Sequence, residues 1–169
     1  VHLIPSGDDP AGVCREYARK LEAAPIDVVC LGIGENGHLA FNDPPVADFS
    51  DPLSVKPVEL DHACRQQQVN DGCFTTLEQV PTHAVTLTIP ALMRGARLFC
   101  MVPGLTKRAA VQATLHDAIS TACPATQLRQ HPNCTLHTHL DACAAVHFAF
   151  NSVARSRFPH PVPHSTLNL

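Results

Sequence analysis

The residues best suited to acid–base chemistry stand in one short stretch, LGIGENGHLAFNDPP, at positions 31–45. His38 is the side chain in this stretch that can accept and release a proton near neutral pH. Asn36 and Asp43 stand on either side of it and can orient the imidazole ring by hydrogen bonding. The alternative is a structural loop, in which His38 caps the chain and Asp43 begins a turn. Because an amide and a carboxylate accompany the histidine, the stretch favours a catalytic loop.

The glycines of this stretch also fit G-x-G-x-x-G, the pattern of dinucleotide-binding loops. That pattern requires a helix directly after the glycines and an acidic residue about 20 positions further on. Pro44 and Pro45 would stop such a helix, so the context disfavours a dinucleotide site. Gly34 and Gly37 instead let the backbone approach a ligand closely and turn its N–H groups inward. We therefore expect these two glycines to contribute to substrate binding.

Elements of regular structure must position this loop. Directly before it, the apolar run 26–31 is typical of a strand buried on both faces of a parallel sheet. Residues 1–5 also predict a strand, and Asp8 or Asp9 can cap a helix over 10–23. Strand, helix and strand in this order indicate an α/β domain. In such domains ligands bind beyond the carboxyl ends of the strands, which is where the loop stands.

The remaining segments continue the alternation of strands and helices. Further strands are predicted at 84–89, 96–102 and 134–140. Helices are predicted at 90–95, 106–119 and 124–131. Prolines predict an extended loop over 43–57, whereas 60–71 fits a strand end or a short helix equally well. We expect a three-layer, Rossmann-like α/β domain with a mostly parallel sheet.

Composition narrows the class of partner. The 169 residues fit one domain, and a net charge of −3 argues against nucleic acid or a membrane surface as a partner. No apolar run approaches the roughly 18 residues of a membrane span. The eight cysteines include no C-x-x-C pair, and several stand in apolar runs. This usage favours reduced thiols and a cytoplasmic protein.

Several stretches together resemble one protein family. LGIGENGHLAFNDPP is similar to the signature of the glucosamine-6-phosphate deaminases (glucosamine/galactosamine-6-phosphate isomerases), which has the form G-[IV]-G-x-[ND]-G-H-[IL]-[AG]-F-N-E-P. QQQVNDGCF, LEQVPTHAVTLTIP, PGLTK with its G-x-x-K, and STACPATQLRQHP follow in the order of the family's motifs. The resemblance spans residues 26–141, and its first motif is highly specific.

The resemblance implies a reaction. Glucosamine 6-phosphate would become fructose 6-phosphate and ammonia, by aldose–ketose isomerisation coupled to deamination, with no cofactor and no metal. The implied partner is a small-molecule amino-sugar phosphate, and whether the chain forms a homo-oligomer stays open. A 6-phosphogluconolactonase-type hydrolase and a non-catalytic sugar-phosphate binding module are the alternatives, followed by a metal-binding protein built on the histidines and cysteines.

The resemblance also assigns roles to residues. His38 occupies the position of the histidine that opens the pyranose ring by proton transfer to the ring oxygen. Asn36 and Asp43 occupy the positions that orient or tune it, although Asp43 is one methylene shorter than the family's glutamate. Lys107 matches the phosphate-binding lysine, and the glycine turn before it suits a phosphate on physical grounds as well. The family's arginine before F-F, a further phosphate contact in some members, is absent from the corresponding NDGCF.

The family's N-terminal part has no counterpart in the sequence. Neither its T-G-x-[ST] phosphate loop nor the carboxylate that moves a proton between C1 and C2 appears before Ile26. We therefore expect residues 1–146 to form a partial sugar-phosphate isomerase/deaminase domain, with N-terminal strands missing and activity impaired. The pattern changes at residues 147–169, which we expect to form an atypical, poorly ordered tail.

Overall fold

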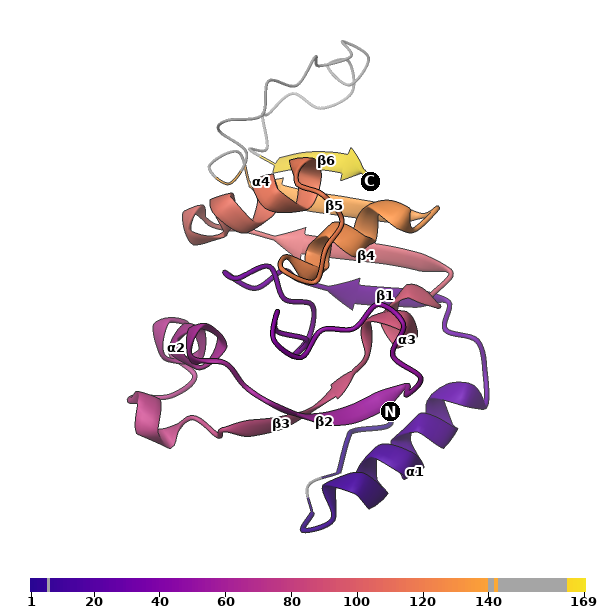
Figure 1. The fold of residues 1–169 in the computed structure, drawn as a ribbon. Helices are drawn as coiled ribbons and strands as arrows, with labels where there is room; N and C mark the ends of the chain where they lie inside the picture. The colour runs from indigo at the N-terminus through magenta and orange to yellow at the C-terminus, as the bar shows by residue number, and fades with distance from the viewer. Residues whose placement is uncertain (6, 140–141, 143–163) are drawn as a thin grey trace.

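The computed structural model describes residues 1–5, 7–139, 142 and 164–169 (Figure 1). The α-helices are α1 (Pro10–Glu22), α2 (His62–Asn70), α3 (Ile89–Met93) and α4 (Arg108–His116). The 3-10 helices are η1 (Leu77–Gln79), η2 (Leu105–Lys107) and η3 (Pro124–Gln130). The strands are β1 (Val28–Leu31), β2 (Val55–Glu59), β3 (His83–Leu87), β4 (Arg97–Val102), β5 (Cys134–His139) and β6 (His164–Asn168).

The strands form two sheets (Figure 1). The larger sheet has the order β1-β4-β5-β6, in which β1, β4 and β5 are parallel and β6 is antiparallel to β5. Strands β2 and β3 form a separate antiparallel pair. The structure therefore confirms an α/β domain with a mostly parallel sheet.

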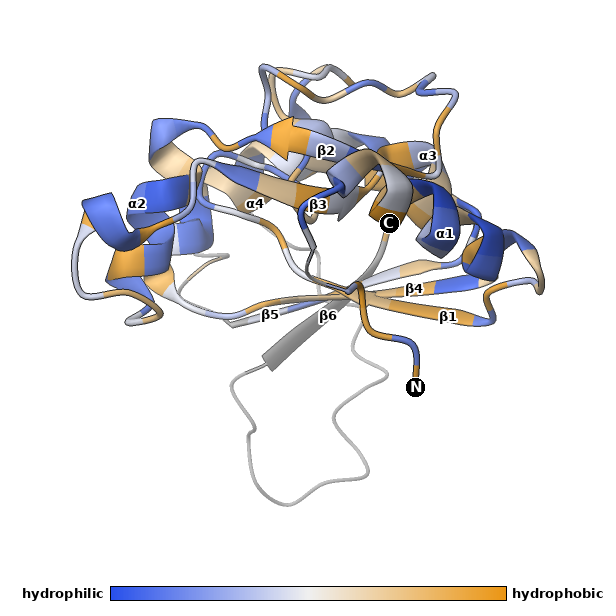
Figure 2. Ribbon diagram, turned by 90° about the horizontal axis from the view of Figure 1, so that it is seen from below, coloured by the Kyte–Doolittle hydropathy of each residue, from blue (hydrophilic) through white to orange (hydrophobic). Residues whose placement is uncertain are grey.

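One face of the larger sheet carries the hydrophobic core. Figure 2 shows the labelled helices on one side of β1, β4, β5 and β6. Along β4, Leu98, Cys100 and Val102 are at most 1% exposed, whereas Met101 between them is 48% exposed. Since side chains alternate along a strand, none of the described elements covers the second face of this sheet at Met101. A third layer is therefore not found among the residues that the structure describes.

Helix α1 begins where the sequence predicted. The Asp9 side chain accepts a hydrogen bond from the Gly12 N–H at 2.9 Å, and Pro10 stands in the first turn. The strand predicted at residues 1–5 is wrong, because these residues pair with none of the described strands. Apolar residues alone do not make a strand unless a neighbour accepts its backbone hydrogen bonds.

Strand β1 lies where it was predicted, but its predicted burial is wrong. It is the edge strand of the larger sheet, and Val28 is 48% exposed. The absence of alternation in 26–31 suggested two covered faces, whereas the described helices cover one. The prediction depended on layers that the described residues do not provide.

The proline-rich loop is shorter than predicted. Residues 55–59 form β2, with Pro57 inside the strand. A proline is tolerated there because, among the described strands, β2 is bonded to β3 alone. Segment 60–71, which the sequence left open, contains helix α2, and the Asp61 side chain caps it by accepting a hydrogen bond from the Cys64 N–H at 2.7 Å.

The predicted division of the chain at residue 146 is not tested, because residues 143–163 lie outside the described residues. The end of the predicted tail is nevertheless ordered as β6, with Ser165 opposite Thr138 of β5. The open edge of β5 supplies the backbone partners for this strand. The described cysteines all have free thiols. Among the described helices, none has the length and apolar character needed to cross a membrane.

Candidate active site

Two loops meet beside the carboxyl ends of β1 and β4. These strands are parallel neighbours, with Leu31 opposite Cys100, so the segments that follow them leave the same edge of the sheet. The loop after β1 carries His38, and the turn after β4 leads to Lys107. Both residues line a cavity of about 420 Å³. A larger hollow of about 540 Å³ near residues 4–13 shares no lining residue with this cavity and is mostly apolar.

The loop after β1 folds back on itself through its own backbone. The Gly34 N–H donates to the His38 carbonyl and the Gly37 N–H donates to the Gly34 carbonyl, both at 3.0 Å. Asn36 Oδ1 accepts a hydrogen bond from the His38 N–H at 3.1 Å. Gly37 has a φ angle of +83°, which glycine adopts without strain. This tight turn brings the side chains of Asn36 and His38 to the same end of β1.

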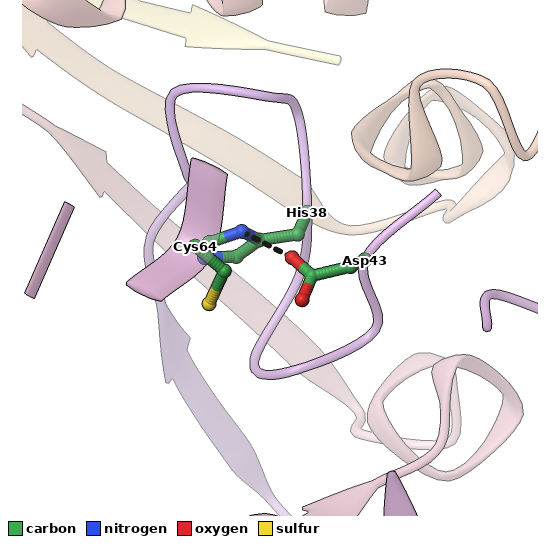
Figure 3. Close-up of side chains that lie close together, drawn as sticks. All are labelled: His38, Asp43 and Cys64. Atoms are coloured by element: carbon green, nitrogen blue, oxygen red, sulfur yellow. Dashed lines mark ion pairs between the residues drawn. The ribbon is translucent and has the colours of Figure 1, made fainter. Parts of the chain in front are cut away.

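Asp43 reaches the imidazole of His38 despite its short side chain (Figure 3). Asp43 Oδ1 lies 2.9 Å from His38 Nδ1, and Asp43 is 0% exposed. The carboxylate also accepts hydrogen bonds from Asn36 Nδ2 at 3.1 Å and from the Asp61 N–H at 3.3 Å. The structure thus brings together the histidine, the amide and the carboxylate that the sequence grouped.

The pKa of the Asp43 carboxyl lies below its ordinary value of 3.8. Burial raises this pKa, but the His38 imidazole, the Asn36 amide and the Asp61 N–H together lower it by more. Asp43 is therefore ionised at neutral pH. A fixed negative charge next to Nδ1 holds the imidazole ring in one orientation.

The ionised Asp43 is expected to make folding stability depend on pH in the acid range. Because its pKa is lower in the folded than in the unfolded state, its stabilisation is complete above the unfolded-state value and is lost as the pH falls through the native value below 3.8. Denaturant unfolding at a series of acid pH values measures this loss. Asp43→Asn should flatten the dependence, whereas Asp8→Asn at an exposed position should retain the wild-type slope. Equal slopes in the wild type and Asp43→Asn would contradict the contacts assigned to Asp43.

Helix α2 and its capping residue supply contacts that the sequence did not single out. Asp61 Oδ2 accepts a hydrogen bond from Asn36 Nδ2 at 3.1 Å. Gln67 lines the cavity, and its Oε1 accepts a hydrogen bond from the Glu35 N–H at 3.0 Å. Cys64, also on α2, lies beside His38 and Asp43 (Figure 3). The polar run QQQVND is the one sequence signal for these contacts. It does not identify a helix, because segment 60–71 fits a strand end equally well.

Lys107 ends η2 and lines the same cavity as His38. Among the described residues that line this cavity, Lys107 is the one lysine or arginine. Burial lowers the pKa of the Lys107 ammonium, and the Glu35 and Asp71 carboxylates act in the opposite direction. Lys107 and His38 therefore line one cavity, and the Asp71 side chain is also among its lining residues.

Comparison with known sequences gives a consistent set of relatives. No family model matches the chain. The chain is 41% identical over 135 residues to glucosamine-6-phosphate deaminases of Bacillus thuringiensis (strain Al Hakam), Bacillus cereus (strain AH820) and Bacillus anthracis (strain A0248). These alignments cover 79% of this chain and 50% of each relative. The chain therefore spans about half the length of the curated relatives it matches.

Comparison with solved structures also finds a glucosamine-6-phosphate deaminase. A monomeric glucosamine-6-phosphate deaminase matches with a TM-score of 0.76 and 29% identity, over 82% of this chain and 56% of that one. The 6-phosphogluconolactonase of Leishmania guyanensis matches with a TM-score of 0.60 and 20% identity, over 81% of this chain and 53% of that one, and shows the shared fold alone. Over the half or so of their length that it covers, the chain is homologous to the glucosamine-6-phosphate deaminases.

Proposed function

We propose that the chain binds an amino-sugar phosphate in the cavity beside β1 and β4, and that His38 opens its pyranose ring. Ring opening is the first step of converting glucosamine 6-phosphate to fructose 6-phosphate and ammonia. The observation that carries the proposal is the buried pair of His38 and Asp43, because His38 of this pair lines the cavity that Lys107 also lines.

The geometry suits a proton transfer at the ring oxygen. Asp43 stands against Nδ1 of the imidazole, which leaves Nε2 for exchange with the sugar. As the bond between C1 and the ring oxygen breaks, His38 gives a proton to that oxygen and the C1 hydroxyl releases its own proton to water, which leaves an open-chain aldehyde. A positioned group of this kind accelerates proton transfer by about 10²–10⁴-fold.

Lys107 is the proposed anchor of the phosphate. Its ammonium shares the cavity with His38, and the turn after β4 places it at the start of α4, where backbone N–H groups favour an anion. A cavity with one cation suits a single phosphate group. With the phosphate held at Lys107, the sugar ring would lie between Lys107 and His38.

The later steps need a further group. Isomerisation requires a base that moves a proton between C1 and C2, and ammonia leaves afterwards. The residues carried over from the family signature supply the ring-opening histidine but not this base. We therefore expect the chain to open the sugar ring while releasing ammonia more slowly than a complete deaminase, by about 10²–10⁴-fold.

Substrate selection tests the proposal. The full chain is incubated with glucosamine 6-phosphate, glucosamine or 6-phosphogluconolactone, while NMR follows exchange between the sugar anomers and separate assays follow ammonia and lactone hydrolysis. Accelerated anomer exchange of glucosamine 6-phosphate, and not of glucosamine, is the expected result. Lactone hydrolysis without any effect on the amino sugar would overturn it in favour of the 6-phosphogluconolactonase-type alternative. Binding without catalysis would overturn it in favour of a sugar-phosphate binding module.

Gly34→Ala is expected to displace His38 and slow ring opening by about 100-fold. A Cβ atom at residue 34 would lie 2.2 Å from His38 Cε1, so the ring must leave its place against Asp43. Gly7→Ala is the matched control, because the nearest atom to a Cβ there is Val13 Cγ2 at 3.9 Å. Anomer exchange and thermal unfolding are measured for both variants. A wild-type exchange rate in Gly34→Ala would show that ring opening does not use His38 in this position.

A further inference from the structure

A third side chain faces the pair of His38 and Asp43. Figure 3 shows Cys64, from α2, beside this pair. The ligand atoms of the three residues, one nitrogen, one carboxylate oxygen and one sulfur, all lie within 4.8 Å of one another. Cys64 is 1% exposed, Asp43 is 0% exposed and His38 is 7% exposed. The ring-opening step makes no use of the Cys64 thiol.

The three donor atoms are not fully satisfied by one another. His38 Nδ1 is 2.9 Å from Asp43 Oδ1, yet no group among the described residues meets this buried nitrogen in a hydrogen-bonding direction. A buried nitrogen that has a carboxylate nearby but no well-directed hydrogen bond is a costly arrangement. A bound cation would engage all three atoms at once.

Their chemistry selects the class of cation. Imidazole, carboxylate and thiolate are the ligand types of Zn²⁺, and a thiolate disfavours Mg²⁺ and Ca²⁺, which take oxygen ligands. One carboxylate and one thiolate cancel the charge of a divalent ion, which removes the main cost of burying it. Two donors on a tetrahedral zinc ion are about 3.4 Å apart, so a trio within 4.8 Å needs side-chain shifts on the order of 1 Å.

The surroundings hold two of these ligands before an ion arrives. Asp43 accepts hydrogen bonds from Asn36 Nδ2 at 3.1 Å and from the Asp61 N–H at 3.3 Å. The Cys64 N–H donates to Asp61 Oδ1 at 2.7 Å, which fixes the start of α2 beside the loop. Such supporting contacts raise metal affinity because the ligands lose little freedom on binding. His38 also lines the cavity, from which an ion and a water ligand can enter.

We infer that His38, Asp43 and Cys64 form an inhibitory binding site for Zn²⁺. On binding, the Cys64 thiol forms a bond to zinc and releases its proton to solvent. The inhibitory effect rests on the proposed role of His38, whereas zinc binding itself does not.

Metal titration of the full chain, without substrate, tests the site. Co²⁺ serves as the spectroscopic probe, and zinc affinity is measured by competition with a chelator. One equivalent of Co²⁺ is expected to give a thiolate-to-metal absorption band. Cys64→Ser should abolish the band and weaken zinc binding by about 100-fold or more. Cys73→Ser, at an exposed thiol, is the matched control and should retain both.

A band or a zinc affinity that survives Cys64→Ser would overturn the inference, as would a wild-type chain without the band. Zinc-edge X-ray absorption of the wild-type chain gives a second measurement that does not depend on the folding of any variant. One sulfur in the zinc shell supports the site, and a shell with no sulfur or several contradicts it. Because these measurements need no sugar, their outcome is separate from that of the ring-opening assay. Zinc that binds at Cys64 while ring opening continues at full rate would overturn the inhibitory role.

Discussion

His38→Ala is expected to lower the rate of ring opening by about 10²–10⁴-fold, the usual contribution of a positioned acid–base group. The variant keeps Lys107, so the affinity for glucosamine 6-phosphate should change little. The rate is measured by NMR exchange between the sugar anomers, and the affinity by calorimetry. A fall in rate at nearly constant affinity distinguishes a chemical role for His38 from a role in binding.

His116→Ala is the matched control for this variant. His116 is an exposed histidine at the end of α4 and does not line the cavity. We expect the wild-type rate and affinity for it. Thermal unfolding of both variants shows whether the loss of a largely buried ring in His38→Ala has altered the fold. A folded His38→Ala chain with the wild-type rate would contradict the assignment of His38.

Lys107→Met is expected to weaken binding of glucosamine 6-phosphate by about 10–100-fold. A hydrogen bond to a charged group contributes about 1.5–3 kcal/mol, and Lys107 is the one lysine or arginine among the described residues that line the cavity. Methionine keeps the length of the side chain and removes its charge. Dissociation constants for glucosamine 6-phosphate and for unphosphorylated glucosamine are compared, and only the first should rise.

Lys20→Met provides the control for loss of one positive charge. Lys20 lies on α1, where its Nζ is 2.7 Å from Glu16 Oε1, and it is not among the residues that line the cavity. We expect it to leave both dissociation constants unchanged. If Lys107→Met raised the dissociation constants of both sugars equally, Lys107 would maintain the shape of the cavity rather than bind the phosphate.

The positions of the loop and of Lys107 could be predicted from sequence because their determinants are local. The glycines and Asn36 shape the loop within a few residues of His38, and the hydrogen bonds inside it join neighbours in the chain. Lys107 directly follows the turn after β4. Once β1 and β4 are expected to be parallel strands, both loops must leave the same edge of the sheet.

The contribution of α2 could not be predicted, because it depends on contacts between distant segments. Asn36 and Asp61 are 25 residues apart, and Glu35 and Gln67 are 32 apart. The run 60–71 is polar and lacks the apolar period that identifies a helix. The proximity of Cys64 to the loop that carries His38 follows from where this helix packs, which no local pattern encodes.

The exposure of β1 has a similar cause. A continuous apolar run predicts a strand but contains no information about how many of its faces are covered. The second face of the sheet is open among the described residues, and the neighbour needed by residues 1–5 is absent from the described strands. The predictions of a two-sided β1 and of a strand at residues 1–5 depended on layers outside the local pattern, and both were wrong.

Exchange between the anomers of glucosamine 6-phosphate tests the central claim most directly, because it reports ring opening without requiring the later steps. The wild-type chain and His38→Ala are compared at equal concentration against buffer alone. We expect exchange to be accelerated by the wild-type chain and to stay near the buffer rate with His38→Ala. Exchange at the same rate with both proteins, whether fast or slow, would contradict a ring-opening role for His38.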